Sequence, residues 1–81
     1  MISLKLINYT METIKLGSHG ESVKTLQNLL KSAGYNLQVD GIFGEITDEI
    51  VKLFQKKAGL HADGICGSKT WDVLTSSKPA A

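Results

Sequence analysis

Hydrophobic residues recur at helical spacing in a segment that begins after Gly17. The apolar positions lie three or four residues apart, as on one face of an α-helix: Val23, Leu26, Leu29, Leu30 and Ala33. The polar positions are expected on or near the opposite face: Lys24, Gln27, Asn28 and Lys31. Ser18 and Glu21 have the spacing of a capping box, and Gly34 is a natural C-terminal stop. We therefore predict a helix over residues 19–33.

A second segment with the same periodicity runs from Gly44 to Gly59. Its apolar arc comprises Ile46, Ile50, Val51, Leu53, Phe54 and Ala58, and its polar arc comprises Glu45, Asp48, Glu49, Lys52, Gln55 and Lys56. Acidic residues lie in the first turns and lysines in the last, as the helix dipole favours. A third, shorter helix is predicted from Ser68 to about Thr75, with Trp71, Val73 and Leu74 as its apolar residues.

The two ends of the chain carry weaker patterns. Ile2, Leu4 and Leu6 alternate with polar residues, which fits a weak strand, a disordered arm or an arm foreign to the natural protein. The last residues, 76–81, resemble a frayed tail or the start of a linker. A chain of 81 residues suffices for one domain. We therefore assign residues 1–13 to an N-terminal arm, 14–75 to the domain and 76–81 to a tail.

One motif occurs twice and divides the chain into two units. The segment Val39-Asp40-Gly41-Ile42-Phe43-Gly44-Glu45-Ile46-Thr47 matches Ala62-Asp63-Gly64-Ile65-Cys66-Gly67-Ser68-Lys69-Thr70. Each copy follows a predicted helix that ends in Ala-Gly and precedes the next predicted helix. Two helix–turn units in series therefore predict an all-α fold, a small bundle of three helices.

The repeated turn has a structural explanation of its own. An aspartate at the start of a turn accepts hydrogen bonds from backbone N–H groups a few residues later, and the next glycine permits a positive φ. The isoleucine is expected to fill the core beneath the turn. Thr47 and Thr70 lie about one turn into their helices, where a hydroxyl can bond back to the turn. We therefore interpret Asp40 and Asp63 as turn-forming residues, not catalytic acids.

The charge balance limits the classes of ligand. The nine basic residues are all lysines, the formal net charge is +1, and the chain contains no arginine. A dedicated nucleic-acid binder normally shows a basic stripe with arginines, and an electrostatic membrane binder shows a basic cluster. We therefore expect neither nucleic acid nor a membrane as partner, although three helices alone would fit a helix-turn-helix. A near-neutral surface suits a polysaccharide or a peptide.

Candidates for metal binding and catalysis are few. Cys66 is the only cysteine, so no internal disulfide forms and the spacing of a zinc site is absent. His19 and His61 are expected in surface loops, and His61 with Asp63 and Cys66 supplies too few ligands for a metal site. No nucleophile–base pair is evident. We expect no metal, no cofactor and no catalytic residue.

The ordered set of motif residues resembles the peptidoglycan-binding domain (type 1) family. The residues that carry the resemblance are Gly17, Gly20, Val23, Leu26, Gln27, Leu30, Gly34, Tyr35, Asp40, Gly41, Phe43, Gly44, Thr47, Val51, Phe54, Gln55, Gly59, Leu60, Asp63, Gly64, Gly67, Thr70, Trp71 and Leu74. They span about residues 14–75. Cys66 departs from the family pattern, which more often has valine or another aliphatic residue there.

The resemblance implies a three-helix module without chemistry of its own. Such modules are attached to amidases, endolysins, spore-cortex enzymes and carboxypeptidases, so it implies binding of cell-wall peptidoglycan, by its glycan strands or stem peptides, and targeting of a hydrolase in the same or a partner chain. A monomer at the cell wall or outside the cell is expected, with export through a missing segment, a non-classical route or lysis. Because related modules occur in metalloproteinase propeptides, docking on a partner enzyme is the alternative.

A binding groove, if present, is expected at the two repeated turns. Each turn lies at a helix N-terminus, where unpaired N–H groups favour carbonyl or carboxylate ligands. The candidate ligand-binding residues are Tyr35, Asp40, Gly44, Thr47, Asp63, Gly67, Thr70 and Trp71. Trp71 is either a sugar-stacking platform or, as we favour, a core anchor. Tyr35 is equally compatible with lining a groove and with packing.

Overall fold

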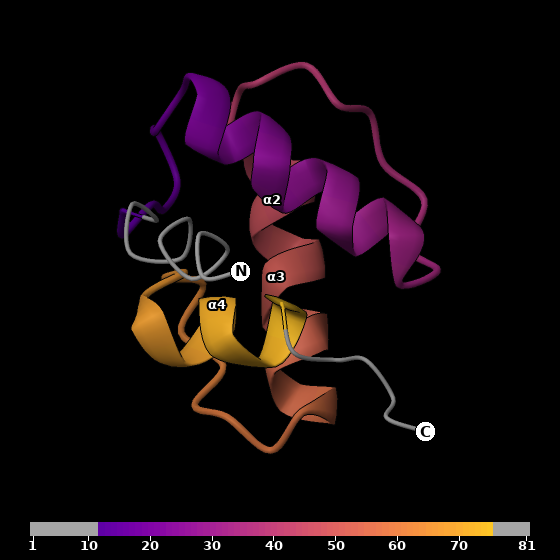
Figure 1. Ribbon diagram of the computed structural model, residues 1–81, viewed down its shortest axis with the longest axis vertical. Coiled ribbons are helices and arrows are strands. Elements are labelled where there is room, and N and C mark those ends of the chain that lie inside the picture. Colours follow the sequence, from indigo (N-terminus) through magenta and orange to yellow (C-terminus); the bar gives the residue numbers. More distant parts are fainter. Residues whose placement is uncertain (1–11, 76–81) are drawn as a thin grey trace, which may run out of the picture.

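The computed structural model describes residues 12–75, and this part of the chain forms three helices (Figure 1). Helix α2 spans Glu21–Ser32, helix α3 spans Glu45–Lys57 and helix α4 spans Ser68–Thr75. Two isolated antiparallel bridges are the only strand-like pairings in the described segment. The predicted all-α bundle of three helices is therefore confirmed. The pattern at residues 1–11 and the tail at 76–81 lie outside the described residues.

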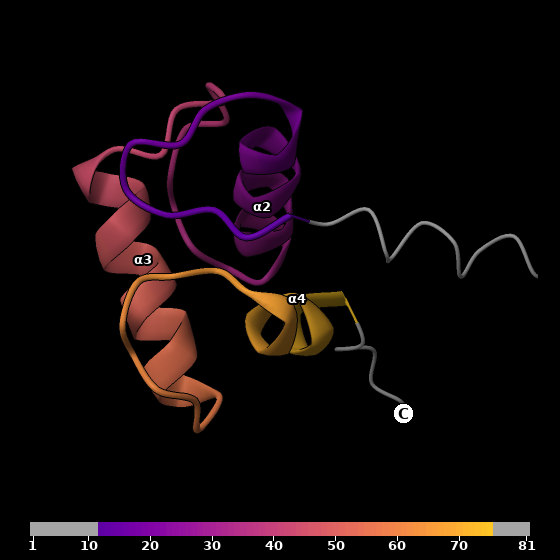
Figure 2. The same ribbon diagram turned by 90° about the vertical axis from the view of Figure 1, so that its left-hand side faces the viewer.

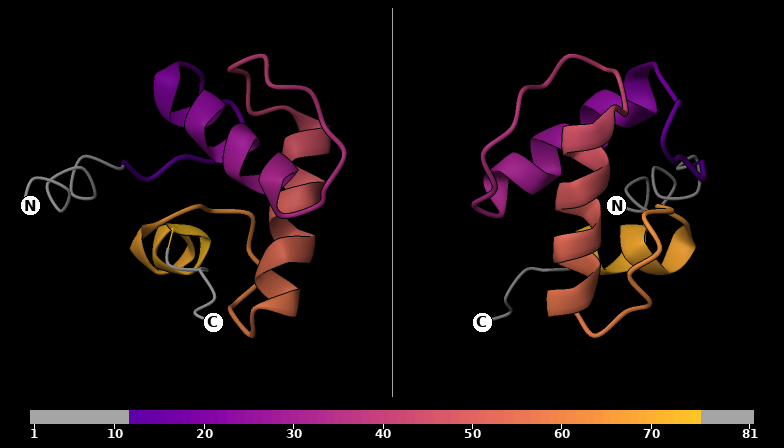
Figure 3. Two further views of the ribbon diagram at one scale, coloured as in Figure 1. Left: turned by 45° about the vertical axis from the view of Figure 1, so that its right-hand side comes forward. Right: turned by 180° about the vertical axis from the view of Figure 1, so that it is seen from behind.

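Helices α2 and α4 lie on the same side of α3, one toward each of its ends (Figures 2 and 3). Helix α2 also contacts α4. The side chains of the shared core are Ile14, Val23, Leu26, Leu30, Leu37, Phe43, Ile50, Val51, Cys66, Trp71 and Leu74. Every helix and every connecting segment contributes to this list, so one hydrophobic core joins the whole described chain.

Both long helices end in the same hydrogen-bonded glycine turn. After α2, the backbone N–H of Tyr35 donates to the Leu30 carbonyl and that of Gly34 to the Lys31 carbonyl, each at 3.0 Å. Gly34 has a φ of 106°, and Gly59, which occupies the same place after α3, has a φ of 79°. These bonds form a Schellman motif, which requires a left-handed residue where glycine is least strained. The prediction of Gly34 as the helix stop is confirmed.

The start of α2 differs from the prediction. Gly20, with a φ of 119°, precedes the first helical residue, and no side chain caps the helix. The Ser18 hydroxyl oxygen instead accepts a hydrogen bond from the backbone N–H of Lys15 at 3.0 Å. The predicted capping box of Ser18 and Glu21 is therefore wrong, because Ser18 belongs to a turn before Gly20 and the helix begins only at Glu21.

Residues 12–20 form a strap that binds both repeated turns. The strap runs between α2 and α4 (Figure 2). At one end the backbone of Ile14 donates to the Cys66 carbonyl at 3.2 Å and accepts from the Cys66 N–H at 2.8 Å. At the other end the backbone N–H of Phe43 donates to the Ser18 carbonyl at 2.9 Å. The strap therefore fixes the two turns relative to each other.

Trp71 fastens the beginning of the strap to α4. Its side chain is only 3% exposed, and its indole N–H donates to the Glu12 carbonyl at 2.9 Å. The interpretation of Trp71 as a core anchor is confirmed, and its buried ring offers no open face for stacking on a sugar. Glu12 had been assigned to the N-terminal arm, so this contact extends the packed structure to the first described residue.

In each repeated turn the isoleucine faces outward and the following residue faces the core. Ile42 and Ile65 are 58% and 41% exposed, whereas Phe43 and Cys66 are 1% and 0% exposed. The prediction that the isoleucines fill the core is therefore wrong. Consecutive residues of an extended segment point to opposite sides, so only one of the two can be buried.

Not every apolar residue of the helices is buried, and not every polar residue is exposed. Ile46 and Leu53, both predicted on the apolar arc of α3, are 64% and 56% exposed. Gln27 and Gln55, predicted on polar faces, are each only 1% exposed. These four predictions are wrong. Gln27 and Gln55 are buried because their amides have specific hydrogen-bond partners, which are described below, whereas Ile46 and Leu53 face solvent.

His19 and His61 are exposed, as predicted for surface residues. Within residues 12–75, no helix combines the length and the apolar character that crossing a lipid bilayer requires.

Burial makes the Cys66 thiol a reporter of unfolding. Desolvation raises its pKa to about 12, so at pH 8 only about one thiol in ten thousand is ionised in the folded state. We expect iodoacetamide to alkylate Cys66 slowly in buffer at pH 8 and rapidly in a denaturing concentration of urea, as followed by mass spectrometry. Equal rates in the two conditions would contradict the buried position.

Candidate ligand-binding site

The two repeated turns have the same backbone conformation. The N–H of Ile42 donates to Asp40 Oδ1 at 3.0 Å, and the N–H of Ile65 donates to Asp63 Oδ1 at 2.9 Å. The glycine after each aspartate has a φ of 78°. The predicted Asx-type turns are therefore confirmed, and Asp40 and Asp63 act as turn-forming residues in the structure.

A buried glutamine from the preceding helix holds the first turn in place. Gln27 Nε2 donates to Asp40 Oδ1 at 3.0 Å, to the Ile42 carbonyl at 3.0 Å and to Thr47 Oγ1 at 3.1 Å. Gln27 Oε1 accepts from the backbone N–H of Gly41 at 2.8 Å. One side chain of α2 thus joins the turn to the first turn of α3, and we call this arrangement the glutamine clasp.

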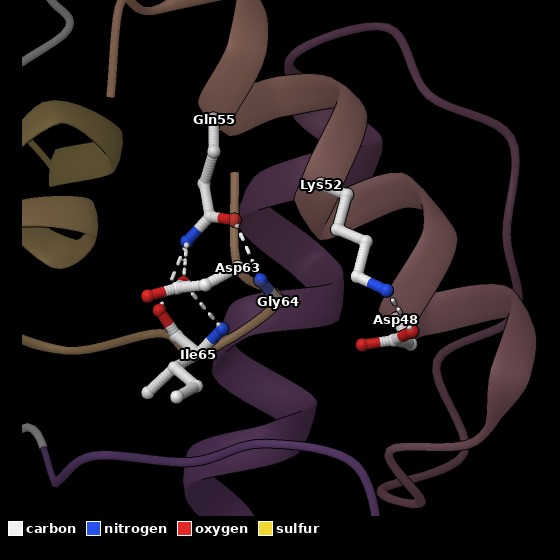
Figure 4. Close-up of polar contacts among 6 residues, drawn as sticks. All are labelled: Asp48, Lys52, Gln55, Asp63, Gly64 and Ile65. Atoms are coloured by element: carbon white, nitrogen blue, oxygen red, sulfur yellow. Dashed lines mark hydrogen bonds and ion pairs between the residues drawn. The ribbon is translucent and has the colours of Figure 1, made fainter. Parts of the chain in front are cut away.

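The second turn contains an equivalent clasp, centred on Gln55 of α3. Gln55 Nε2 donates to Asp63 Oδ1 at 3.3 Å and to the Ile65 carbonyl at 2.9 Å, and Oε1 accepts from the Gly64 N–H at 2.9 Å (Figure 4). Gln55 Nε2 also donates to Thr70 Oγ1 of α4 at 3.1 Å. The sequence duplication therefore extends to a duplicated hydrogen-bond network.

Thr47 and Thr70 contribute to these networks differently from the prediction. Both side chains are 4% exposed, and both hydroxyl oxygens accept from a clasp glutamine, as described above. The expected link between threonine and turn is thus indirect, since the glutamine amide lies between them. Among the described residues, no buried side-chain nitrogen or oxygen lacks a hydrogen-bond partner, which is the condition for a stable buried polar group.

A lysine stem covers the glycine of each turn. A Cβ added to Gly41 would lie 3.3 Å from the Lys24 side chain, and one added to Gly64 would lie 3.0 Å from the Lys52 side chain and 2.5 Å from Asp48 Oδ1. Lys52 forms an ion pair with Asp48 at 3.2 Å, beside the second turn (Figure 4). Both turns therefore require glycine for its positive φ and for the close approach of the helix before it.

The turn geometry lowers the pKa values of both aspartates. The pKa of Asp40 is held below its usual range, first by the hydrogen bond from the Ile42 N–H and then by the one from Gln27. The pKa of Asp63 is lowered in the same way by Ile65 and less strongly by Gln55. Carboxylates that accept several hydrogen bonds are stabilised in their charged form, and neither aspartate is suited to act as a general acid near neutral pH.

An open hollow of about 1220 Å³ lies beside the first turn, and we call it the connector hollow. Helix α2, the connector at residues 36–40, the turn and the start of α3 line it: Gln27, Lys31, Asn36, Leu37, Gln38, Val39, Asp40, Ile42, Gly44, Glu45, Ile46 and Thr47. Gly44 precedes α3, and no side chain caps this helix. The first backbone N–H groups of α3 therefore remain available beside the hollow.

Only some of the predicted site residues lie together in the structure. Asp40, Gly44 and Thr47 all line the connector hollow. Their counterparts Asp63, Gly67 and Thr70 form the second turn and lie outside the lining of this hollow. The buried Trp71 lies outside it as well.

Tyr35 lies in a second hollow of about 490 Å³, which it shares with Leu53, Lys56 and Lys57. We call this the lysine hollow.

Several residues that line the connector hollow were not predicted as site residues from the sequence. Ile42 and Ile46 were expected to be buried, Gln27 was expected to face solvent, and Lys31 and Glu45 were assigned only to polar faces. One unused signal lay in the helices before the turns, where Val23-Lys24-Thr25-Leu26-Gln27 matches Val51-Lys52-Leu53-Phe54-Gln55. This second repeat marks both clasp glutamines.

Within residues 12–75, no three side chains of the metal-binding types His, Cys, Asp and Glu come together.

Removing either clasp glutamine is expected to destabilise the fold strongly. Gln27→Leu preserves the volume but leaves the buried Gly41 N–H without an acceptor, and Gln55→Leu does the same to Gly64. Each substitution should lower the free energy of unfolding by about 2–4 kcal/mol, measured by urea denaturation. The control Asn28→Leu alters an exposed neighbour and should change it by less than about 0.5 kcal/mol. Equal effects of Gln27→Leu and Asn28→Leu would contradict the clasp.

The lowered pKa values predict a loss of stability in acid. Since Asp40 and Asp63 have folded-state pKa values below their unfolded ones, their contribution is present above the unfolded pKa of about 3.9 and is lost as the pH falls through the folded values. The urea midpoint should therefore fall less between pH 6 and pH 2.5 in Asp40→Asn/Asp63→Asn than in the wild type. Glu49→Gln, at an exposed residue of α3, is the control. Identical pH profiles for wild type and double variant would refute this assignment.

Comparison with known proteins identifies the module. The family model described as "Putative peptidoglycan binding domain" matches residues 19–74. The chain is 40% identical over 78 residues to a spore cortex-lytic enzyme of Bacillus cereus, a match covering 94% of this chain and 30% of that enzyme. It spans less than a third of the curated relatives it matches first.

Solved structures show the same arrangement of helices. The SleB N-terminal domain superposes with a TM-score of 0.79 at 41% identity, and the match covers 83% of this chain and 93% of that domain. A Burkholderia AP3 phage endolysin gives a TM-score of 0.80 at 43% identity, over 83% of this chain and 26% of the endolysin. The chain therefore belongs to the family of peptidoglycan-binding domains found in cell-wall hydrolases.

Proposed function

We propose that this module binds bacterial cell-wall peptidoglycan through the connector hollow and thereby holds an associated hydrolase on its substrate. The observation that carries the proposal is the position of this hollow at the uncapped start of α3. The first N–H groups of a helix without a capping side chain bind carbonyl or carboxylate oxygens well. Peptidoglycan offers such oxygens in its acetamido, lactyl and peptide groups.

Besides the charged Lys31, Asp40 and Glu45, the hollow is lined by amide and apolar side chains that suit an uncharged stretch of this polymer. Asn36 and Gln38 are exposed residues with side-chain amides, and Ile42 and Ile46 are exposed apolar residues. Amides provide hydrogen bonds that fix a ligand's orientation, while the apolar side chains contact methyl groups and shield those bonds from water. N-acetyl and alanyl groups carry an amide beside a methyl group, so this combination of side chains matches their chemistry.

The role that follows is targeting, without chemistry in this chain. A module of modest affinity, attached to a hydrolase, converts each later encounter of the enzyme with the wall into an intramolecular event and raises the local concentration. The relatives support this role, because they include a spore cortex-lytic enzyme and an endolysin in which the matching segment is a minor part of the length. The corresponding place of action is the cell wall or the extracellular space.

Binding to purified sacculi tests the function and separates it from docking on a protein partner. Sacculi contain no protein partner, so sedimentation of the isolated module with them supports peptidoglycan binding. Ile46→Ser should raise the dissociation constant about fivefold, because it removes roughly 1 kcal/mol of apolar contact in the hollow.

Leu16→Ser is the matched control for this measurement. Leu16 is 53% exposed on the strap and lies outside the hollow, so its loss should leave sedimentation unchanged. Folded protein that stays in the supernatant at all sacculus concentrations would refute the proposed function. Equal binding by the Ile46 and Leu16 variants would place the binding surface elsewhere.

A further inference from the structure

Two lysines, a leucine and a tyrosine line the lysine hollow. Lys56 and Lys57 are adjacent in the last turn of α3, and the hollow that they share with Tyr35 and Leu53 has a volume of about 490 Å³. Leu53 is 56% exposed, so an aliphatic surface accompanies the two cations. A ligand matched to this hollow carries a negative charge next to an apolar group.

Both lysines are available to such a ligand. In the part of the chain that the structure describes, the ion pairs are Lys24 with Glu21 and Lys52 with Asp48, and neither involves Lys56 or Lys57. The last carbonyl groups of α3 would otherwise attract these ammonium groups. Backbone N–H groups of the glycine turn around Gly59 already donate to three of these carbonyl groups, those of Phe54, Gln55 and Lys56.

Residues that are close in the chain line the lysine hollow and the connector hollow. Tyr35 lines one and Asn36, its neighbour in the chain, lines the other. Ile46 of the connector hollow and Leu53 of the lysine hollow are two helical turns apart on one face of α3, a separation of about 10 Å. An extended ligand of a few residues can therefore contact both hollows at once.

We propose that the lysine hollow binds a carboxylate of a peptidoglycan stem peptide whose neighbouring residues lie in the connector hollow. This inference rests on the proposed function and adds the part of the polymer that is recognised. In peptidoglycan the lactyl carboxyl is consumed in an amide bond to the peptide, so the glycan strand is largely neutral and the carboxylates belong to the stem peptide. Alanine methyl groups beside a carboxylate match the pairing of Leu53 with the two lysines.

A double-mutant cycle between protein and ligand tests this assignment. The ligands are a synthetic stem tetrapeptide with free carboxylates and the same peptide with all carboxylates amidated, titrated against the ¹⁵N-labelled module. Lys56→Gln/Lys57→Gln should weaken binding of the free-acid peptide by about two- to tenfold, as for exposed ion pairs, and leave binding of the amidated peptide unchanged. Lys15→Gln/Lys69→Gln, at exposed lysines of the strap and of α4, is the charge-matched control and should bind both peptides like the wild type.

The outcomes separate this inference from the proposed function. If the wild type sediments with sacculi but the double variant binds both peptides like the wild type, the carboxylate subsite is refuted and the function stands. If the wild type does not sediment, the proposed function and the carboxylate subsite are both refuted.

Sacculi with and without acid-extractable teichoic acid provide the last comparison. A binding defect of the double variant that disappears after extraction would assign the hollow to phosphate and overturn the carboxylate proposal.

Discussion

Two buried glutamine amides determine how the helices of this module are placed. Each amide satisfies a turn glycine N–H, a turn carbonyl, an aspartate and a threonine hydroxyl of the next helix, as Gln27 does in the first unit. Without the amide, backbone groups of a tight turn would be buried without partners, which is costly. Because every clasp links one helix to the beginning of the next, the same interaction that stabilises a turn also orients two helices.

The two clasps have the same hydrogen bonds, but the chain segments between the glutamine and the aspartate differ in length. Gln27 and Asp40 are 13 residues apart, whereas Gln55 and Asp63 are only 8 apart. The longer first unit has room for the connector at residues 36–40, which forms one wall of the connector hollow. We therefore interpret the duplication as a structural frame and the difference between its copies as the origin of the proposed binding surface.

Much of the fold could be predicted from local patterns in the sequence, and most of the wrong predictions had one cause. Periodicity located the three helices, and the Ala-Gly and Asp-Gly signals located their stops and turns, because these depend on nearby residues only. The periodicity also assigned Gln27 and Gln55 to solvent and Ile46 to the core, because it assumes that polar residues are exposed and apolar residues are buried. The site was only partly predictable. Asp40, Gly44 and Thr47 line the connector hollow, but Tyr35 lines the lysine hollow. This division depends on how α3 lies beside the connector.

We propose that the clasped first turn presents a peptidoglycan-binding surface. The most direct measurement is the mapping of amide chemical shifts during titration of the ¹⁵N-labelled module with soluble muropeptides. We expect the largest changes at residues 36–40, at the backbone of Ile46 and at the side-chain amide of Gln27. Changes confined to α4 and the second turn, with residues 36–46 unperturbed, would contradict the account.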